Sequence, residues 1–274
     1  MRLDDAPESG NVTDSRGMGG KLALGGGAGG ILLVVLGLIF GVDLGGGGQR
    51  AANTNGPPDE KTLVFTKRVL GTTEDVWNTE FKKMGKKYRP PHLELFSDRV
   101  KTGCGTAPSA VGPFYCPADE KVYIDPTFFN ELEQKLGGSK AQFSQAYVIA
   151  HEVGHHVQRL LGFTAREHDN GASVRLELQA DYLAGVWAHQ GQKKFNFIEP
   201  GDVEEAIKSA NAIGDDRLQK RSGGFAHPEK FTHGTSRQRV YFFQRGLKTG
   251  DASMATLQKF FDVPTGRNGE LQDF

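Results

Sequence analysis

The stretch YVIAHEVGHHVQRLLG, residues 147–162, places several ionisable side chains inside an apolar segment with the spacing of a helix. His151 and His155 are four residues apart, so their imidazoles project from one helix face and can bind one metal ion. Glu152 stands between them, where its carboxylate can reach a metal-bound water. This pattern of His-Glu-x-x-His on a helix is typical of zinc hydrolases, in which the glutamate is the general base.

A catalytic zinc needs three protein ligands and one open position. We expect the third ligand on the next helix, where the segment ELQAD places Glu177 and Asp181 on one face. Glu177 is the predicted ligand, and Asp181 is predicted to accept a hydrogen bond from a ligand histidine. The alternative is a solvated acidic face, but the flanking residues are apolar, and a buried carboxylate pair needs a cation or donors. His156 points away from the metal and is expected to be hydrogen-bonded in the core.

The elements that must position these residues are mostly helical. Short strands are predicted at 93–97 and 121–125. Helices are predicted at 72–87, from Asp125-Pro126 onward, and at 139–161, 173–190, 202–213, 235–248 and 251–261. Ser139 with Gln142 forms a capping-box pattern, and Gly162 and Gly191 are predicted C-terminal ends. The fold class expected is therefore α+β, predominantly helical with a small sheet, and strand 121–125 could offer an open edge to an extended peptide.

The N-terminal part differs in composition from the rest of the chain. Residues 1–21 are polar and predicted to be a disordered tail. Residues 22–42 carry no charge, and as a helix they would span roughly 30 Å, the thickness of a bilayer core, so we predict one transmembrane helix. A cleaved signal peptide is the alternative, disfavoured by the long polar lead and the lack of a nearby cleavage site. Residues 43–60 are predicted to be a Gly/Pro-rich linker, and residues 61–274 the folded domain.

Charge and cysteine content predict where the domain lies. Arg2, Arg16 and Lys21 precede the apolar run and only Arg50 follows it closely, which favours a cytoplasmic N-terminus. The domain would then be periplasmic or extracellular, on a single-pass protein of the cell membrane. Glycine pairs in the run, Gly26/Gly30 and Gly37/Gly41, would permit helix packing and are a weak sign of a homodimer.

Two further totals constrain the protein. The two cysteines, Cys104 and Cys116, are predicted to form one disulfide, which would require an oxidising compartment; two free thiols are the alternative. The formal net charge is zero, and no basic stripe indicates nucleic-acid binding.

Longer stretches resemble a known family. The segments HEVGHHVQ and ELQAD, with CGTAPSAVGPFYCPADEKVYID before them and FTHGTSRQRVYFF after them, resemble the bacterial neutral zinc metallopeptidase family over most of residues 57–262. That family is similar to the gluzincin metallopeptidases, so the resemblance implies a zincin-like domain with bound Zn²⁺. The implied roles are zinc ligands for His151, His155 and Glu177, general base for Glu152, and ligand support for Asp181. Tyr182 stands where many members would have a cysteine, so one disulfide is expected instead of two.

The function expected is a membrane-anchored zinc metallopeptidase acting on a peptide or protein substrate. The oxyanion of the reaction needs a further donor, for which His233 and Tyr241 are candidates, with His227 behind them. One alternative is a non-proteolytic binding or scaffold protein with a structural metal site, although such sites have four protein ligands and no need of Glu152. A second alternative is another zinc hydrolase, such as an amidase, with the same ligands.

Overall fold

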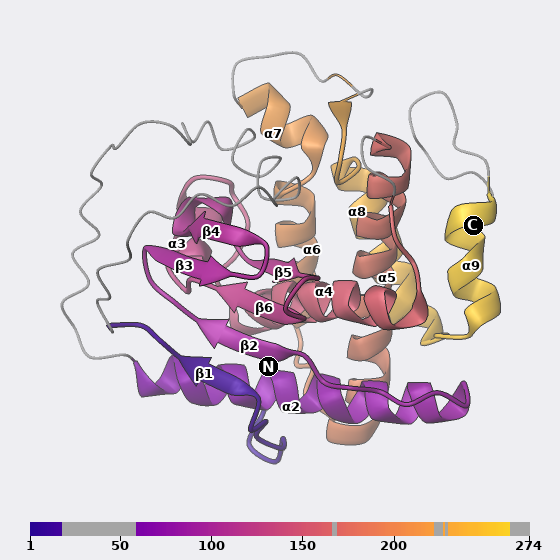
Figure 1. Ribbon diagram of the computed structural model, residues 1–274, viewed down its shortest axis with the longest axis horizontal. Helices are drawn as coiled ribbons and strands as arrows, with labels where there is room; N and C mark the ends of the chain where they lie inside the picture. Colours follow the sequence, from indigo (N-terminus) through magenta and orange to yellow (C-terminus); the bar gives the residue numbers. More distant parts are fainter. Residues whose placement is uncertain (18–58, 166–168, 222–226, 228–229, 264–274) are drawn as a thin grey trace.

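The computed structural model describes residues 1–17, 59–165, 169–221, 227 and 230–263 (Figure 1). The strands are β1 (Val12–Asp14), β2 (His92–Leu95), β3 (Arg99–Thr102), β4 (Gly105–Pro108), β5 (Phe114–Cys116) and β6 (Lys121–Ile124). The helices are α2 (Glu60–Lys83), α3 (Phe128–Gln134), α4 (Gln142–Leu161), α5 (Asn170–Phe195), α6 (Asp202–Ala212), α7 (Asp215–Arg221), α8 (Ser236–Thr249) and α9 (Met254–Asp262), with the 3₁₀ turn η1 (Ser109–Val111). The predicted α+β class, mostly helical with a small sheet, is confirmed.

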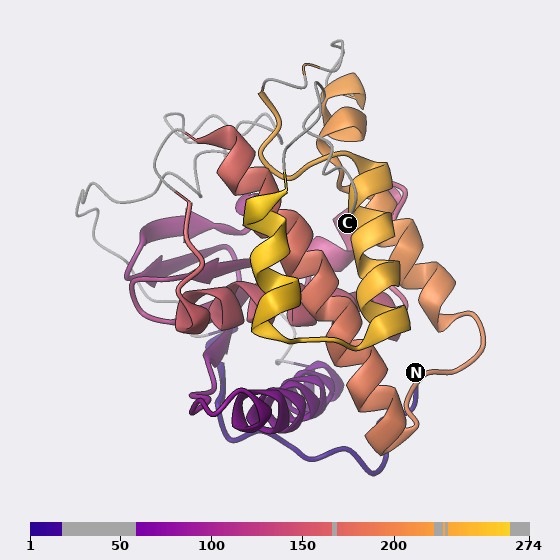
Figure 2. The same cartoon turned by 90° about the vertical axis from the view of Figure 1, so that its right-hand side faces the viewer.

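Helix α4 lies at the centre of the fold. It packs against β5 and β6 on one side and against α5 and α6 on the other, while α2 runs along the lower edge in Figure 1. Seen from the side, α8 and α9 lie next to α5 (Figure 2). The central position of α4 explains why most of its residues are buried, including the polar side chains of His151, Glu152 and His156.

The main sheet has the strand order β1-β2-β6-β5. β2 is parallel to β1 and to β6, and β5 is antiparallel to β6. Leu93 and Leu95 alternate with half-buried residues along β2 and are buried in the core, as the period of a strand requires. Strands β2 and β6 confirm the predicted strands near 93 and 121. The prediction of an open edge at 121–125 is wrong, because β6 is an interior strand and β5 is the edge.

A disulfide joins Cys104 to Cys116, as predicted. Cys104 lies in the turn of the antiparallel hairpin β3–β4, and Cys116 ends the edge strand β5. The bond therefore ties the hairpin to the edge of the main sheet. A small separate core supports this region; it consists of Phe96, Val100, Ala107, Val111, Phe114, Cys116 and Tyr123.

The helices α4 and α5 approach each other closely at Gly154. A Cβ atom at Gly154 would lie 3.2 Å from Cα of Ala180, so the missing side chain lets the second helix come near. α4 ends at Gly162, whose φ of 87° suits glycine, as predicted. It begins at Gln142, however, and the predicted capping box is absent: Ser139 Oγ accepts from the Ala141 amide instead.

Two predicted helix bounds are wrong, one because of a tertiary contact and the other because of a local cap. α5 continues past Gly191, where a side chain would collide with the Phe197 ring, so this glycine permits packing and does not end the helix. α2 begins at Glu60, twelve residues before the predicted start, and Asp59 caps it by accepting from the Lys61 amide.

Helix α8 crosses α5 at two more glycines, Gly185 and Gly246, each of which would clash with the other helix if it had a Cβ.

The N-terminal residues are not a disordered tail. Residues 1–17 pack against the rest of the fold, and residues 12–14 form strand β1 beside β2 (Figure 1). The predicted transmembrane segment 22–42 and most of the predicted linker 43–60 lie outside the described residues. Within the part of the chain that the structure describes, no helix is both long and apolar enough to cross a membrane.

Candidate metal centre and active site

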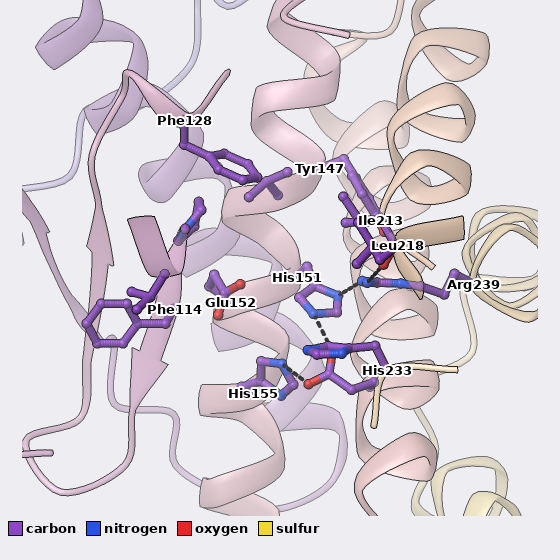
Figure 3. A pocket seen from close by; sticks show the side chains of 15 residues that line it. Phe114, Phe128, Tyr147, His151, Glu152, His155, Ile213, Leu218, His233 and Arg239 are labelled. Atoms are coloured by element: carbon purple, nitrogen blue, oxygen red, sulfur yellow. Dashed lines mark hydrogen bonds and ion pairs between the residues drawn. The ribbon is translucent and has the colours of Figure 1, made fainter. Parts of the chain in front are cut away.

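Two helices bring the predicted ligands together. α4 carries His151 and His155 one turn apart, and α5 places Glu177 opposite them. The His151 Nε2 atom is 3.2 Å from Glu177 Oε2, and the His155 Nε2 atom is 3.4 Å from Glu177 Oε1. One potential ligand atom from each residue lies within 4.8 Å of the other two, which is close enough for a single metal ion. Figure 3 shows both imidazoles at the wall of one pocket.

Hydrogen bonds at the outer ring nitrogens select the tautomers of both histidines. His151 Nδ1 lies 2.9 Å from Asp181 Oδ1, so it donates to this carboxylate, as predicted. His155 Nδ1 lies 2.9 Å from Gln158 Oε1. The Gln158 amide is oriented by its own donation to the Leu176 carbonyl, which leaves Oε1 as the acceptor. Each Nε2 is therefore the ring nitrogen that is left to face the metal position.

Sequence reasoning missed Gln158, although a signal was present. It follows His155 by three residues, so the two side chains are neighbours on the helix surface. Gln158 also donates to Gln179 Oε1 at 3.0 Å, and Gln179 donates to the Leu257 carbonyl. This chain of amides links the α4 ligand to α5 and to α9, so the orientation of His155 depends on three helices.

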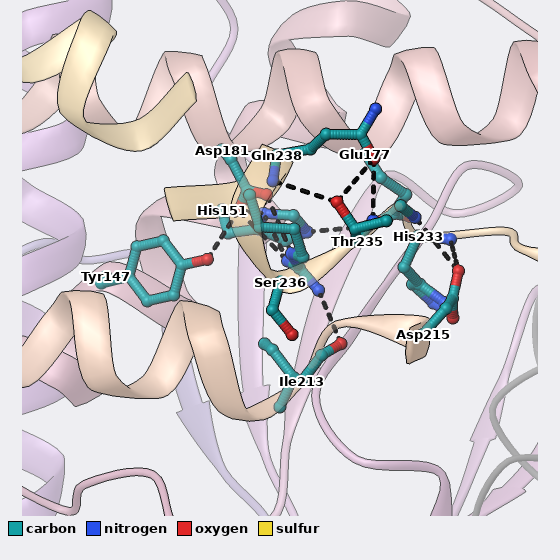
Figure 4. Close-up of polar contacts among 12 residues, drawn as sticks. Tyr147, His151, Glu177, Asp181, Ile213, Asp215, His233, Thr235, Ser236 and Gln238 are labelled. Carbon is teal, nitrogen blue, oxygen red and sulfur yellow. Dashed lines mark hydrogen bonds and ion pairs between the residues drawn. The ribbon is translucent and has the colours of Figure 1, made fainter. Parts of the chain in front are cut away.

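Asp181 is the centre of a buried network (Figure 4). Its carboxylate accepts from the Tyr147 hydroxyl at 2.6 Å and from Arg239 Nε at 2.9 Å and Nη2 at 3.1 Å, besides His151. Burial by itself would raise the pKa of Asp181, but Arg239 and His151 outweigh it and the pKa is lowered. Arg239 also donates to the Ile213 carbonyl. Tyr147 and Arg239 were not predicted, and Arg239 stands 58 residues beyond Asp181.

Glu152 lines the same pocket and is buried, with 8 % of its surface exposed. None of the described residues is hydrogen-bonded to its carboxylate, and burial raises its pKa. Figure 3 shows it between His151 and Phe114. A buried carboxylate without a partner is costly, so it is expected only where it has a task. The other walls are largely apolar; they include Val111, Pro113, Phe114, Phe128, Tyr147, Val148, Ile213 and Leu218.

His233 enters the pocket from the side opposite Phe114 and Phe128 (Figure 3). Its Nδ1 atom lies 3.1 Å from Asp215 Oδ1, and its amide donates to Asp215 Oδ2 at 2.7 Å. Burial lowers the pKa of His233, but the charges of Glu177 and Asp215 outweigh it and raise the pKa. Because Asp215 occupies Nδ1, Nε2 is the ring nitrogen available to a substrate.

Asp215 builds the loop that carries His233. Its Oδ2 atom accepts from the amides of Thr232, His233 and Gly234, and the side chain is almost completely buried. These bonds fix residues 232–234, which directly precede the start of α8 (Figure 4). Asp215 was not predicted, because nothing in the local pattern distinguishes it from an ordinary acid at a helix start.

Two other candidates lie elsewhere. Tyr241 is 45 % exposed on α8, where its hydroxyl accepts from Arg245, and it does not line the pocket. It faces away because its position on α8 is two residues after that of Arg239, which corresponds to the other side of a helix. His227 is exposed and is also absent from the pocket lining. His156 is buried between the Tyr115 hydroxyl and the Arg89 carbonyl, the hydrogen-bonded core position predicted for it.

The charges of the site suit a divalent cation. Glu152, Glu177 and Asp181 are buried carboxylates, and among the described residues Arg239 is the buried guanidinium that faces them. Burial by itself would lower the pKa of His151, but Asp181 and Glu177 outweigh this effect and raise the pKa to about 10. The carboxylates that favour a proton on this imidazole favour a metal ion equally. Two imidazole nitrogens and a carboxylate, with the pocket at the fourth position, are the donor set of a catalytic zinc.

Comparisons with known proteins agree with this geometry. The chain is 44% identical over 278 residues, 92% of this chain and 96% of the relative, to the protein described as "Uncharacterized protein YpfJ" of Escherichia coli (strain K12). It is 43% identical over 201 residues, 68% of each chain, to "Uncharacterized protein Rv2575" of Mycobacterium tuberculosis. No solved structure matches the chain. Residues 1–257 match a family model, which shows that the chain belongs to the family described as "Putative neutral zinc metallopeptidase".

Proposed function

We propose that this protein is a zinc metallopeptidase that hydrolyses peptide bonds with His151, His155 and Glu177 as zinc ligands. The observation that carries the proposal is Glu152, a buried carboxylate beside the ligands that no described residue satisfies. A metal held only for stability would not need it. Family membership and the three converging ligands support the same proposal.

The residues divide the chemistry between them. The zinc supplies Lewis acidity, which lowers the pKa of a water molecule and polarises the scissile carbonyl. Glu152 accepts the proton of the attacking water and delivers it to the departing amine. His233, held by Asp215, donates from Nε2 to the oxyanion. Asp181, with Arg239 and Tyr147, holds the imidazole of His151 in place.

The substrate is proposed to bind beside β5. Among the described strands only β6 pairs with β5, so the outer edge of β5 has no strand partner. Phe114 of this strand lines the pocket next to Glu152. An extended peptide added along this edge would bring its backbone past the metal position and its side chains against the apolar walls. The disulfide to the β3–β4 hairpin would hold this edge in position.

The scaffold alternative lacks an observation in its favour. A structural zinc site has four protein ligands, whereas the described residues contribute three at this point, and the fourth side opens to the pocket. Another zinc hydrolase, such as an amidase, would use the same residues, and substrate profiling distinguishes the two.

Location outside the cytoplasm is also proposed, because the disulfide requires an oxidising compartment. Attachment to the cell membrane through residues 22–42 follows from their uncharged composition. The homodimer suggested by the glycines of that run remains a minor proposal.

The test combines zinc content with activity. The full chain, purified without added metal, is expected to hold close to one zinc per chain and to cleave peptides of a mixed library. Glu152→Gln should keep the zinc and lower kcat by about 10²- to 10⁴-fold, the usual contribution of a general base. Glu133→Gln is the matched control: this half-buried acid of α3 pairs with Lys140 and does not line the pocket, so its change should affect neither zinc content nor kcat. Full activity of Glu152→Gln, or no zinc after reconstitution, would overturn the proposal.

A further inference from the structure

Residues 1–17 form part of the peptidase fold, and we propose that they lie in the same compartment as the rest of the domain. It follows that the two described parts, residues 1–17 and the part that begins at residue 59, lie on the same side of any membrane. The proposal concerns the placement of the chain and is independent of the proposed hydrolysis; it bears on the proposed membrane attachment only in that it is incompatible with a single crossing. Three sets of contacts, at the two ends and the middle of the N-terminal segment, carry it.

The first contacts complete the sheet. β1 pairs with β2 in a parallel register that sets Val12 opposite Leu93 and Asp14 opposite Leu95. The Leu93 amide donates to the Asn11 carbonyl and the Ser15 amide to the Leu95 carbonyl, each at 2.8 Å. Without β1, the edge of β2 would lose these partners. Figure 1 shows β1 in indigo between β2 and α2.

The second contacts join the middle of the segment to α2. Ser9 is buried; its amide donates to the Lys67 carbonyl and its hydroxyl to Glu74 at 2.6 Å. The Asn11 side chain donates to the same Glu74 carboxylate at 2.8 Å. One half-buried acid of α2 therefore accepts hydrogen bonds from two side chains of a segment more than 60 residues earlier in the chain.

A glycine in α2 shows that the helix is built for this neighbour. Glycine inside a helix costs about 1 kcal/mol relative to alanine, so Gly71 needs a reason. A Cβ atom there would lie 2.1 Å from the carbonyl oxygen of Pro7. Gly71 therefore admits the backbone of the N-terminal segment, which a chain whose two parts were on opposite sides of a membrane would not require.

The third contacts lie near the end of α5. The Arg2 amide donates to the Phe197 carbonyl at 2.8 Å, and Leu3 is buried in the main hydrophobic core. The segment thus contacts β2, α2 and the residues after α5 along its whole described length.

These contacts conflict with a single membrane crossing. A transmembrane helix at 22–42 would place residues 1–17 and 59–263 on opposite sides of a hydrocarbon layer roughly 30 Å thick. All three sets of contacts would then be lost. The sequence-based expectation of a cytoplasmic N-terminus with a domain outside is therefore replaced by a chain that leaves the fold at residue 17 and re-enters it at residue 59 on one side.

The experiment compares two single-cysteine positions in the full-length protein. Asp5→Cys marks the N-terminal segment and Lys87→Cys marks the domain; both positions are exposed. Cells are treated with a membrane-impermeant maleimide before or after lysis, and a cytoplasmic protein with an exposed thiol serves as the permeability control. We expect the two positions to give the same labelled fraction before lysis. Labelling of one position in intact cells and of the other only after lysis would overturn the proposal.

A second measurement tests the contact itself in native membranes. Thr13→Cys with Glu94→Cys joins partners of the β1–β2 register, and Thr13→Cys with Glu133→Cys is the distant control. A protease site inserted between residues 43 and 58 is cut after treatment with a short bis-maleimide. After cutting, the register pair should keep the two fragments cross-linked in one band, whereas the control pair should give two separate fragments. Release from both pairs would overturn the proposal.

Discussion

His151, His155 and Glu177 stand on two packed helices, whereas His233 stands on a loop between α7 and α8. The helical side is ordered by i, i+4 spacing and by the close approach at Gly154. The loop side is ordered by one buried acid, Asp215, which accepts three backbone amides. Under the proposed function, this difference would divide two tasks: the helical side would hold the metal, and the loop side would act on the substrate. Changes on the two sides should therefore have separable effects.

The largest effect is expected from a ligand itself. His155→Asn should abolish zinc binding and, with it, activity. The loss of zinc affinity should exceed the roughly 10- to 100-fold loss that is typical of residues that only support a ligand. The adjacent residue provides the control, because His156 points to Tyr115 and not to the metal position. Elemental analysis of both purified variants checks this. Equal zinc loss from His156→Asn would contradict the assignment of His155 as a ligand and of His156 as a core residue.

On the loop side, His233→Ala should lower kcat by about 10²- to 10³-fold, the usual effect of losing one oxyanion donor. Zinc content should stay at the wild-type level, because His233 is not a ligand. Asp215→Asn should act in the same direction but less strongly, since the imidazole remains. Steady-state kinetics with Tyr241→Phe as control checks this. Loss of zinc from His233→Ala would contradict the prediction that changes on the loop side leave metal binding intact.

The support of a ligand should matter less than the ligand. Gln158→Leu removes the acceptor of His155 Nδ1, and we expect zinc affinity to fall about 10- to 100-fold. Competition with a zinc chelator measures it. Gln145→Leu is the matched control, because this half-buried glutamine of the same helix donates to the Lys140 carbonyl and does not line the pocket. Unchanged affinity in Gln158→Leu would mean that the tautomer of His155 is selected by other contacts.

The smallest effect concerns stability and pH. Burial lowers the pKa of His156, and the Arg89 carbonyl only partly offsets this. Below about pH 6.5 the unfolded chain therefore binds more protons than the folded one. The contribution of His156 to the free energy of unfolding should therefore be most favourable above that pH and fall by up to about 1.4 kcal/mol per pH unit below it. His151 and His233, whose pKa values are raised, act in the opposite direction in both proteins, so the difference between the wild type and His156→Asn isolates the contribution of His156. Urea unfolding at several pH values, with the metal-free protein and with metal-free His156→Asn, checks this. The prediction is contradicted if the free energy of unfolding changes with pH by the same amount in both.

The parts predicted best from sequence are those with local rules. The ligand helices are long and strongly periodic, and the spacing of His151, His155 and Glu152 has the same meaning in any helix. The disulfide was predictable because only two cysteines exist. The parts that failed depend on distant neighbours: residues 12–14 form a short polar strand only because β2 offers an edge, and Gly191 continues its helix because Phe197 fills the space.

The sequence by itself determined the candidate site: which side chains could hold a metal ion, which carboxylate lies beside them, and that both belong to helix α4 and its neighbour. The tertiary structure decided what orients them. Arg239 and Asp215 reach the site from residues far along the chain, and Tyr241 is excluded from it, because helix packing sets these distances. The tertiary structure also decided that residues 1–17 belong to the fold. Local spacing follows from backbone geometry, whereas such contacts depend on the packing of the whole chain.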